Sequence, residues 1–320
     1  MNNQKVRWGI IGCGAVTEVK SGPAFQKVEN SELVAVMRRS GELAKDYAER
    51  HGVAKWYDDA DALISDPEID AIYIATPPNS HKEYTIKAAR AGKPVYVEKP
   101  MALNWEECQE MIAVCKQAKV PLYVAYYRRA LEPFLKIKEL LNQRLIGDIR
   151  FVTIKHYQKE SENQKDSWRT NPEIAGGGLL FDMGSHTLDI LDYLLGPIKE
   201  AKGFASNQGG NYAAEDMVTG TFLFESGVHG VGNWCFSANE NVEINEIVGN
   251  KGKIVFSTLN MGLIELITEE GTEEWNFKLP KHIQQPLIED IVNDILGNRV
   301  SPSTGESGAR TNRIMDILVN

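Results

Sequence analysis

Residues 9–18 read GIIGCGAVTE and place two glycines, Gly12 and Gly14, between an apolar run and the start of a helical pattern. Glycine lets the backbone turn tightly and approach a pyrophosphate, whose charge is then bound by the N–H groups at the helix N-terminus. The spacing fits the pattern G-x-G-x-x-G, with Thr17 at the third position. It predicts a dinucleotide-binding turn, although a glycine pair after a strand also occurs in ordinary turns. The residues predicted to line it are Gly12, Gly14, Ala15, Val16 and Thr17.

The arrangement of apolar runs divides the chain into two parts. Up to about residue 125, short apolar runs alternate with amphipathic stretches, which is typical of a parallel sheet covered by helices. From about residue 149, strand-like runs follow one another with short turns, which predicts a mostly antiparallel sheet. We therefore predict an α/β fold, with a Rossmann dinucleotide-binding domain over residues 1–124. An α+β domain on an open, mostly antiparallel sheet is predicted over residues 125–320.

Composition narrows the classes of partner. The 320 residues include 35 basic and 44 acidic side chains, a net charge of −9, and no basic tract longer than a pair. This argues against nucleic acid and against an anionic membrane, and favours a small metabolite as ligand. The start, MNNQKVRWGIIG, has no apolar signal region, so we expect a cytoplasmic location. The four cysteines form no C-x-x-C pair, and we expect no metal site.

The second predicted strand ends in AVMRRS, residues 35–40. In dinucleotide-binding units an acidic residue at this place binds the adenosine ribose. Here the strand is followed instead by Arg38, Arg39 and Ser40, and guanidinium groups offer fork-shaped donors to a phosphate. The segment therefore predicts NADP as the preferred cofactor, with NAD possible; the alternative is a solvated arginine pair.

Two further segments follow predicted strands. ATPPNSH covers residues 75–81, and VYVEKPMALN covers residues 95–104. In an open parallel sheet, ligands bind beyond the carboxyl ends of the strands, so both segments should face the same crevice as the glycine turn. Lys99 is then directed toward the cofactor. The residues predicted to surround the cofactor here are Thr76, Pro77, Asn79, His81, Glu98 and Lys99.

A carboxylate and an imidazole occur four residues apart in GGGLLFDMGSHTLDILDYLLG, residues 176–196. If a helix begins near Gly184, Asp182 lies at its entrance and His186 in its first turn. The positive end of the helix dipole disfavours imidazolium, which suits a proton-accepting histidine. The alternatives are a helix cap for Asp182 and a packed or surface histidine for His186.

Four segments together resemble the glucose-fructose oxidoreductase, inositol dehydrogenase and MocA family of nicotinamide-dependent oxidoreductases, over nearly the whole chain. They are GIIGCG, ATPPNSH, AGKPVYVEKPMALN and AGGGLLFDMGSHTLDIL. The resemblance implies a Rossmann domain followed by an open-faced sheet domain that binds substrate. It implies NAD(P)-dependent dehydrogenase or reductase activity on a sugar, cyclitol or related polyol.

The resemblance also implies roles for individual residues. His186 would accept the hydroxyl proton, Asp182 would bind or relay at the neighbouring hydroxyl, and Lys99 would reach the substrate hydroxyl. The Lys99–Pro100 bond would be cis. Trp168 and Arg169 match a W-R segment that would flank the nicotinamide.

Two other functions remain open from the sequence: a non-catalytic dinucleotide-binding regulator, and an NAD-dependent glycosidase on the same scaffold. The combination of Lys99, Asp182 and His186 argues against the regulator, since a sensor needs no proton acceptor. An exposed sheet face in the second domain would normally be covered, so we also expect a homodimer or homotetramer.

Overall fold

The computed structural model describes residues 5–161 and 164–320, which divide into two compact units. The first comprises the chain as far as Ala102, with Glu106–Ala130 and Leu279–Gly308. The second comprises the remaining segments, Leu103–Trp105, Leu131–Lys278 and Ala309–Asn320.

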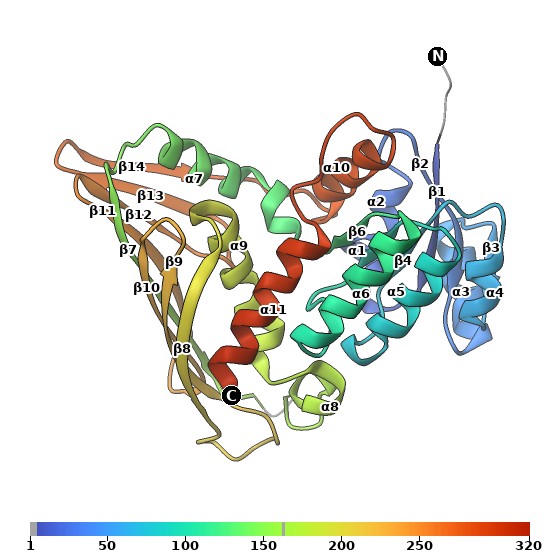
Figure 1. The fold of residues 1–320 in the computed structure, drawn as a ribbon, viewed down its shortest axis with the longest axis horizontal. Helices are drawn as coiled ribbons and strands as arrows, with labels where there is room; N and C mark the ends of the chain where they lie inside the picture. The colour runs from blue at the N-terminus through green and yellow to red at the C-terminus, as the bar shows by residue number, and fades with distance from the viewer. Residues whose placement is uncertain (1–4, 162–163) are drawn as a thin grey trace. The chain divides into compact units, whose positions relative to one another are not determined.

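The first unit is built on a six-stranded parallel sheet with the strand order β3-β2-β1-β4-β5-β6 (Figure 1). Its central strands are buried on both faces, as their unbroken apolar sequences predict. The sequence order reverses between β1 and β4, the place where such sheets open to a ligand. The strands are β1 (Val6–Ile11), β2 (Ser31–Met37), β3 (Lys55–Tyr57), β4 (Ala71–Ile74), β5 (Val95–Val97) and β6 (Leu122–Val124).

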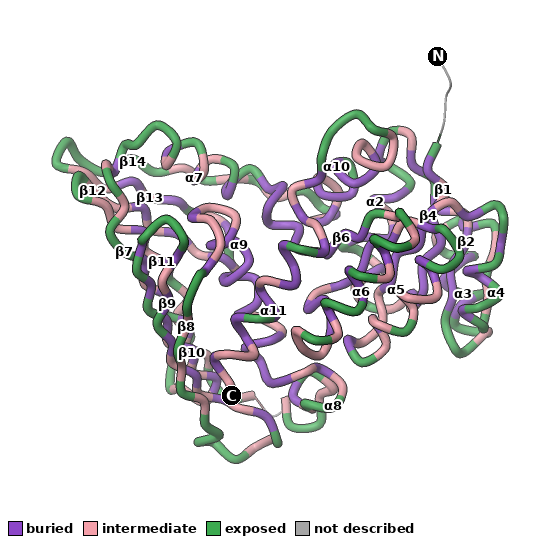
Figure 2. The backbone as a smooth tube through the Cα atoms, viewed as in Figure 1, coloured by how far each residue is buried: buried purple, intermediate pink, exposed green. Residues whose placement is uncertain are grey.

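Helices cover this sheet, and buried positions alternate with exposed ones along them (Figure 2). Phe25 of α2 forms an aromatic cluster with residues of the sheet. Its ring centroid lies 4.9 Å from that of Trp8 and 5.3 Å from that of Tyr73. The helices are α1 (Ala15–Val19), α2 (Gly22–Phe25), α3 (Gly41–His51), α4 (Ala60–Ser65), α5 (His81–Arg90), α6 (Trp105–Ala118) and α10 (Gln285–Ile295), with 3₁₀ turns at Pro78–Ser80 and Tyr127–Ala130.

The two units are not separated at one point in the chain. The sequence predicts a single boundary after residue 124, whereas the structure returns Leu279–Gly308 to the first unit. Hydrogen bonds explain this return. The Tyr96 hydroxyl donates to Gln284 Oε1 over 2.8 Å, and Ser303 Oγ donates to the carbonyl of Val124 over 2.7 Å.

The second unit is built on an eight-stranded sheet with the order β14-β13-β12-β11-β7-β10-β9-β8. β7 and β10 pair in parallel and the other neighbours are antiparallel, so the predicted mostly antiparallel sheet is confirmed. The strands are β7 (Ile149–Lys159), β8 (Ile198–Ser206), β9 (Met217–Phe224), β10 (His229–Ala238), β11 (Val242–Gly249), β12 (Gly252–Phe256), β13 (Leu263–Thr268) and β14 (Gly271–Asn276).

Among the described residues, the helices of this unit pack against one face of this sheet (Figure 1). On that inner face Phe134 of α7 contacts Phe256, with ring centroids 6.3 Å apart, and Leu318 of α11 packs against Gly203 and Gly220. These glycines let the helix approach the strands closely. The helical segments of this unit are α7 (Glu132–Asn142), α8 (Pro172–Ala175), α9 (Ser185–Leu195) and α11 (Gly305–Val319, from Ala309 onward), with a 3₁₀ turn at Trp168–Thr170 and a π-helical turn at Leu180–Gly184.

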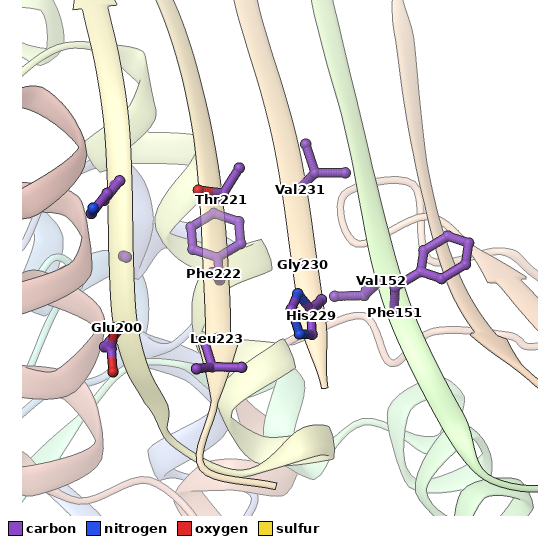
Figure 3. Close-up of a pocket in the computed structure, with 11 residues that line it drawn as sticks. Phe151, Val152, Glu200, Thr221, Phe222, Leu223, His229, Gly230 and Val231 are labelled. Carbon is purple, nitrogen blue, oxygen red and sulfur yellow. The ribbon is translucent and has the colours of Figure 1, made fainter. Parts of the chain in front are cut away.

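The outer face of the same sheet carries apolar side chains that remain exposed. A shallow hollow lies over β7, β8, β9 and β10 and is lined by Phe151, Leu223, His229 and Val231 (Figure 3). Phe204 on β8 is 86% exposed. The exposed large apolar residues of the sheet are Phe151, Phe204, Val231, Ile244 and Leu263.

Candidate active site

The glycine turn has the geometry that its sequence predicts. Gly12 has a φ of +91°, which favours glycine, and the N–H groups of Gly12 and Cys13 donate to the carbonyl of Met37 over 2.9 and 3.1 Å. The third position acts as a cap. Thr17 Oγ1 donates to the Gly14 carbonyl over 2.9 Å and accepts from the Gly14 N–H over 3.0 Å. The Thr17 hydroxyl, which a glycine or alanine lacks, therefore stabilises the turn.

The same bonds bring the basic segment beside this turn, because Arg38 follows Met37 directly. Burial raises the pKa of the Cys13 thiol to about 11, while the nearby charge of Arg38 opposes that rise. Arg38, Arg39 and Ser40 are exposed, and among residues 5–161 and 164–320 neither guanidinium has an ion-pair partner. Two arginines that no carboxylate neutralises leave donors available to an anion.

The loop after β4 is held by its own polar side chains. Ser80, the last residue of the 3₁₀ turn that contains Asn79, donates from its Oγ to Thr76 Oγ1 over 2.7 Å. His81 is fully buried at the start of α5, and its ring nitrogens lie 2.8 Å from the Thr76 carbonyl and 3.1 Å from the Pro100 carbonyl. His81 therefore links this loop to the one after β5.

The loop after β5 contains Lys99, and its bond to Pro100 is cis, as the family resemblance implies. Glu98 is 8% exposed, and its carboxylate is directed into the unit. Oε1 accepts from the Tyr73 hydroxyl over 2.6 Å and from Gln284 Nε2 over 2.7 Å. Neither partner was predicted from the sequence; Gln284 lies 186 positions from Glu98, and no local pattern connects the two.

In the second unit, Asp182 lies in the π-helical turn Leu180–Gly184, and His186 is the second residue of α9. The α-helix begins at Ser185, as predicted, but a π-helical turn precedes it without a break. Gly184 itself has helical dihedral angles, so the helical run begins at Leu180 and His186 lies more than one turn inside it. The dipole argument for a neutral histidine is weakened accordingly, because that effect is confined to the first turn. A Cβ at Gly184 would lie 2.7 Å from Leu180 Cδ1 and 3.2 Å from Trp234 Nε1, so glycine allows close packing there.

The predicted W-R segment lies near this turn. Arg169 Nε is 3.3 Å from Asp182 Oδ2, and the Arg169 guanidinium lies 4.5 Å from the centre of the Trp168 ring. Asp182 has a quarter of its side chain exposed, whereas His186 is buried with 6% exposed. The structure thus brings Arg169 to the carboxylate of Asp182; the contact of Trp168 and Arg169 with the nicotinamide stays a prediction.

Within the described part of the chain, no group of three or more histidine, cysteine, aspartate or glutamate side chains could hold a metal ion. No helix among those residues has the length and apolar character needed to cross a membrane.

Comparison with known proteins agrees with this geometry. Residues 6–126 match the oxidoreductase family with an NAD-binding Rossmann fold, and residues 134–255 match the GFO/IDH/MocA C-terminal domain. Oxidoreductase P35 of Formosa agariphila is 41% identical over 319 residues, 98% of each chain. The 1,5-anhydro-D-fructose reductase of Ensifer adhaerens is 27% identical over 94% of this chain and 92% of its own.

Solved structures share the whole fold. The aldose-aldose oxidoreductase from Caulobacter crescentus, complexed with glycerol, has a TM-score of 0.87 at 28% identity, and the match covers 98% of this chain and 96% of that one. Levoglucosan dehydrogenase, complexed with NADH and levoglucosan, has a TM-score of 0.87 at 24% identity, with the same coverage.

A Rossmann unit with a glycine turn, joined to an open-sheet unit, defines an NAD(P)-dependent oxidoreductase. The chain belongs to the GFO/IDH/MocA family, as the sequence resemblance predicts.

Proposed function

We propose that the protein is an NADP-preferring oxidoreductase that transfers a hydride between the cofactor and a hydroxyl-bearing carbon of a sugar, cyclitol or related polyol. The proposal depends chiefly on the occurrence of Asp182 and His186 on one helical run, in a chain that also has a dinucleotide-binding unit. The nicotinamide ring supplies the hydride chemistry when it is bound.

The remaining steps belong to side chains of this chain. Oxidising an alcohol requires an acceptor for the hydroxyl proton within hydrogen-bond reach. A ring nitrogen of His186 accepts this proton, and Asp182, which is paired with Arg169, binds the neighbouring hydroxyl. Lys99 stabilises negative charge on the reacting oxygen through its ammonium group.

The first test is His186→Ala. We expect turnover to fall by ~10²–10⁴-fold, the usual contribution of a positioned acid or base, while NADPH affinity changes little. His51→Ala is the control. The His51 ring, on α3, lies 2.8 Å from the carboxylate of Glu18 on α1, so its loss should not affect turnover. Unchanged turnover in His186→Ala would exclude His186 from the mechanism.

Relatives support a sugar as substrate, since their names describe an anhydrofructose reductase and an aldose-aldose oxidoreductase. A screen of D-glucose, D-xylose, myo-inositol and 1,5-anhydro-D-fructose with each cofactor, followed by nicotinamide absorbance, identifies the substrate. Cofactor that copurifies and is regenerated during sugar cleavage would favour the glycosidase. Binding without turnover of any sugar would favour the regulator.

The preference for NADP rests on Arg38 and Arg39 beside the glycine turn. A charge-assisted hydrogen bond to the 2′-phosphate is worth roughly 1.5–3 kcal/mol, or about ten- to a hundredfold in affinity. Arg38→Asp should weaken NADPH binding by this factor and improve NADH binding, because it restores a ribose-binding carboxylate. Arg90→Asp is the control, since it makes the same charge change at an exposed residue of α5. An unchanged NADPH/NADH ratio in Arg38→Asp would refute the phosphate site.

We also propose that a second copy of the chain covers the outer face of the eight-stranded sheet. Phe204 is 86% exposed there, and Phe151, Val231, Ile244 and Leu263 also leave apolar surface exposed on the sheet, which isolated monomers rarely do to this extent. Phe204→Glu should shift the sedimentation coefficient toward the monomer, whereas Val300→Glu, at an exposed residue of the first unit, should not. A native protein that sediments as a monomer would contradict this assembly.

A further inference from the structure

Glu98 is a charged residue in the interior of the first unit. One of its carboxylate oxygens accepts two short hydrogen bonds, from the Tyr73 hydroxyl at 2.6 Å and from Gln284 Nε2 at 2.7 Å. Gln284 is in turn fixed by the Tyr96 hydroxyl, which donates to its Oε1 over 2.8 Å. Burial, with the charge of Glu98 adding to it, raises the pKa of Tyr73 well above its usual range. The Tyr73 hydroxyl therefore keeps its proton and remains a donor.

The other carboxylate oxygen is bound to the main chain of the next residue. Glu98 Oε2 accepts the Lys99 N–H over 3.2 Å. The carboxylate thus ties the backbone of Lys99 to strand β4, through Tyr73, and to Gln284, the N-cap residue of α10. A buried carboxylate is costly unless several donors satisfy it, and here they do.

The following residues are held from the opposite side by His81. Its Nδ1 lies 3.1 Å from the Pro100 carbonyl and 3.3 Å from the Met101 carbonyl, and its Nε2 lies 2.8 Å from the Thr76 carbonyl. The ring is fully buried. The segment Glu98–Met101 is therefore anchored both before and after Lys99.

We propose that Glu98, held by Tyr73 and Gln284, is a positioning residue that orients Lys99 for hydride transfer. This inference rests on the proposed function, in which the Lys99 ammonium acts on the reacting oxygen. Catalytic groups must be held within ~0.5 Å of their productive position, and a misplacement of about 1 Å can cost about a hundredfold in rate. The sequence interpretation of Glu98 as a cofactor contact predicts a different result, namely weaker cofactor binding when the network is disturbed.

Two variants test the network. Tyr73→Phe removes one hydroxyl and keeps the ring that stacks on Tyr96, with centroids 4.8 Å apart. Glu98→Gln keeps the shape, but in either orientation its NH₂ group meets a donor, either the Lys99 N–H or the Tyr73 and Gln284 donors. We expect each variant to lower kcat roughly ten- to a hundredfold. The Kd for NADPH, measured by fluorescence, should stay within about twofold of the native value.

Tyr57→Phe is the matched control. Its hydroxyl also donates to a carboxylate, Asp66 Oδ2, over 2.8 Å, but on the edge strand β3. Its loss should lower the free energy of unfolding by about 1 kcal/mol, as for any such hydrogen bond, and should leave kcat unchanged. A change in kcat that follows stability alone would appear in this control as well.

The decisive measurement is a double-mutant cycle with Lys99→Ala, using the most active substrate of the screen with NADP⁺ if it is oxidised or NADPH if it is reduced. If the network acts through Lys99, Tyr73→Phe causes no further loss of kcat in the Lys99→Ala background. Additive losses would overturn the inference, and so would native kcat in both single variants or a parallel loss of NADPH affinity. Should Glu98→Gln fail to fold, Tyr73→Phe and Gln284→Met decide the question. Native turnover in Lys99→Ala would instead overturn the proposed function itself.

Discussion

Gly12 and Gly14 lie two positions apart in the chain, but the structure predicts different effects when each is replaced by alanine. Gly12→Ala should lower the stability of the fold, whereas Gly14→Ala should lower the affinity for the cofactor. Gly12 has a φ of +91°, and a Cβ there would lie 2.7 Å from Thr76 Cγ2, 2.9 Å from Thr76 N and 3.0 Å from the Ala75 carbonyl carbon. A positive φ costs an L-residue roughly 1–2 kcal/mol, and overpacking against backbone atoms costs about 1–3 kcal/mol. Gly12→Ala should therefore lower the free energy of unfolding by about 2–5 kcal/mol.

Gly14 has extended dihedral angles, φ −147° and ψ −154°, which any residue adopts. The nearest atom to a Cβ at this position is the Gly12 carbonyl oxygen, 3.8 Å away. Gly14→Ala should therefore leave the free energy of unfolding within ~0.5 kcal/mol of the native value. Its methyl group would still stand where the backbone must approach the pyrophosphate, so NADPH affinity should fall about tenfold or more.

Urea denaturation followed by circular dichroism measures the first effect, and NADPH titration measures the second. Native stability in Gly12→Ala would refute the argument from backbone geometry. Native NADPH affinity in Gly14→Ala would refute the assignment of this turn as the pyrophosphate site.

Two further predictions concern charged groups. The Arg50 hydrogen bond lowers the pKa of Glu18 from 4.5 to about 2, so the stability it adds is present above pH 4.5 and is lost as pH falls through 2. Glu18 is 36% exposed, so Glu18→Gln should cost only about 1 kcal/mol at pH 7 and nothing near pH 2, as urea titrations at both pH values would show. An equal cost at both would contradict this. Arg310 donates two 2.7 Å hydrogen bonds to Asp192, whose side chain is 5% exposed. Arg310→Met should cost about 3 kcal/mol in urea denaturation, and a loss below ~1 kcal/mol would show that the pair contributes little.

The sequence alone determined the division into a parallel and a mostly antiparallel sheet, because local apolar periodicity reports which faces of a strand are buried. It also determined the glycine turn at Gly12 and the position of Lys99 at the end of β5. Both follow from residues that are neighbours in the chain. The four-residue interval between Asp182 and His186 was equally visible, since it too is local.

Tertiary structure decided the features that depend on distant segments. Gln284 donates a hydrogen bond to Glu98, which lies 186 positions earlier in the chain, and no local sequence pattern predicts such a partner. The sequence predicted the start of α9 near Gly184, but not the π-helical turn Leu180–Gly184 that precedes it. The periodicity of apolar residues predicts which side of a helix or strand is buried. The hydrogen-bond partner of a buried polar group depends on which distant segments pack against it, so the local sequence does not predict it.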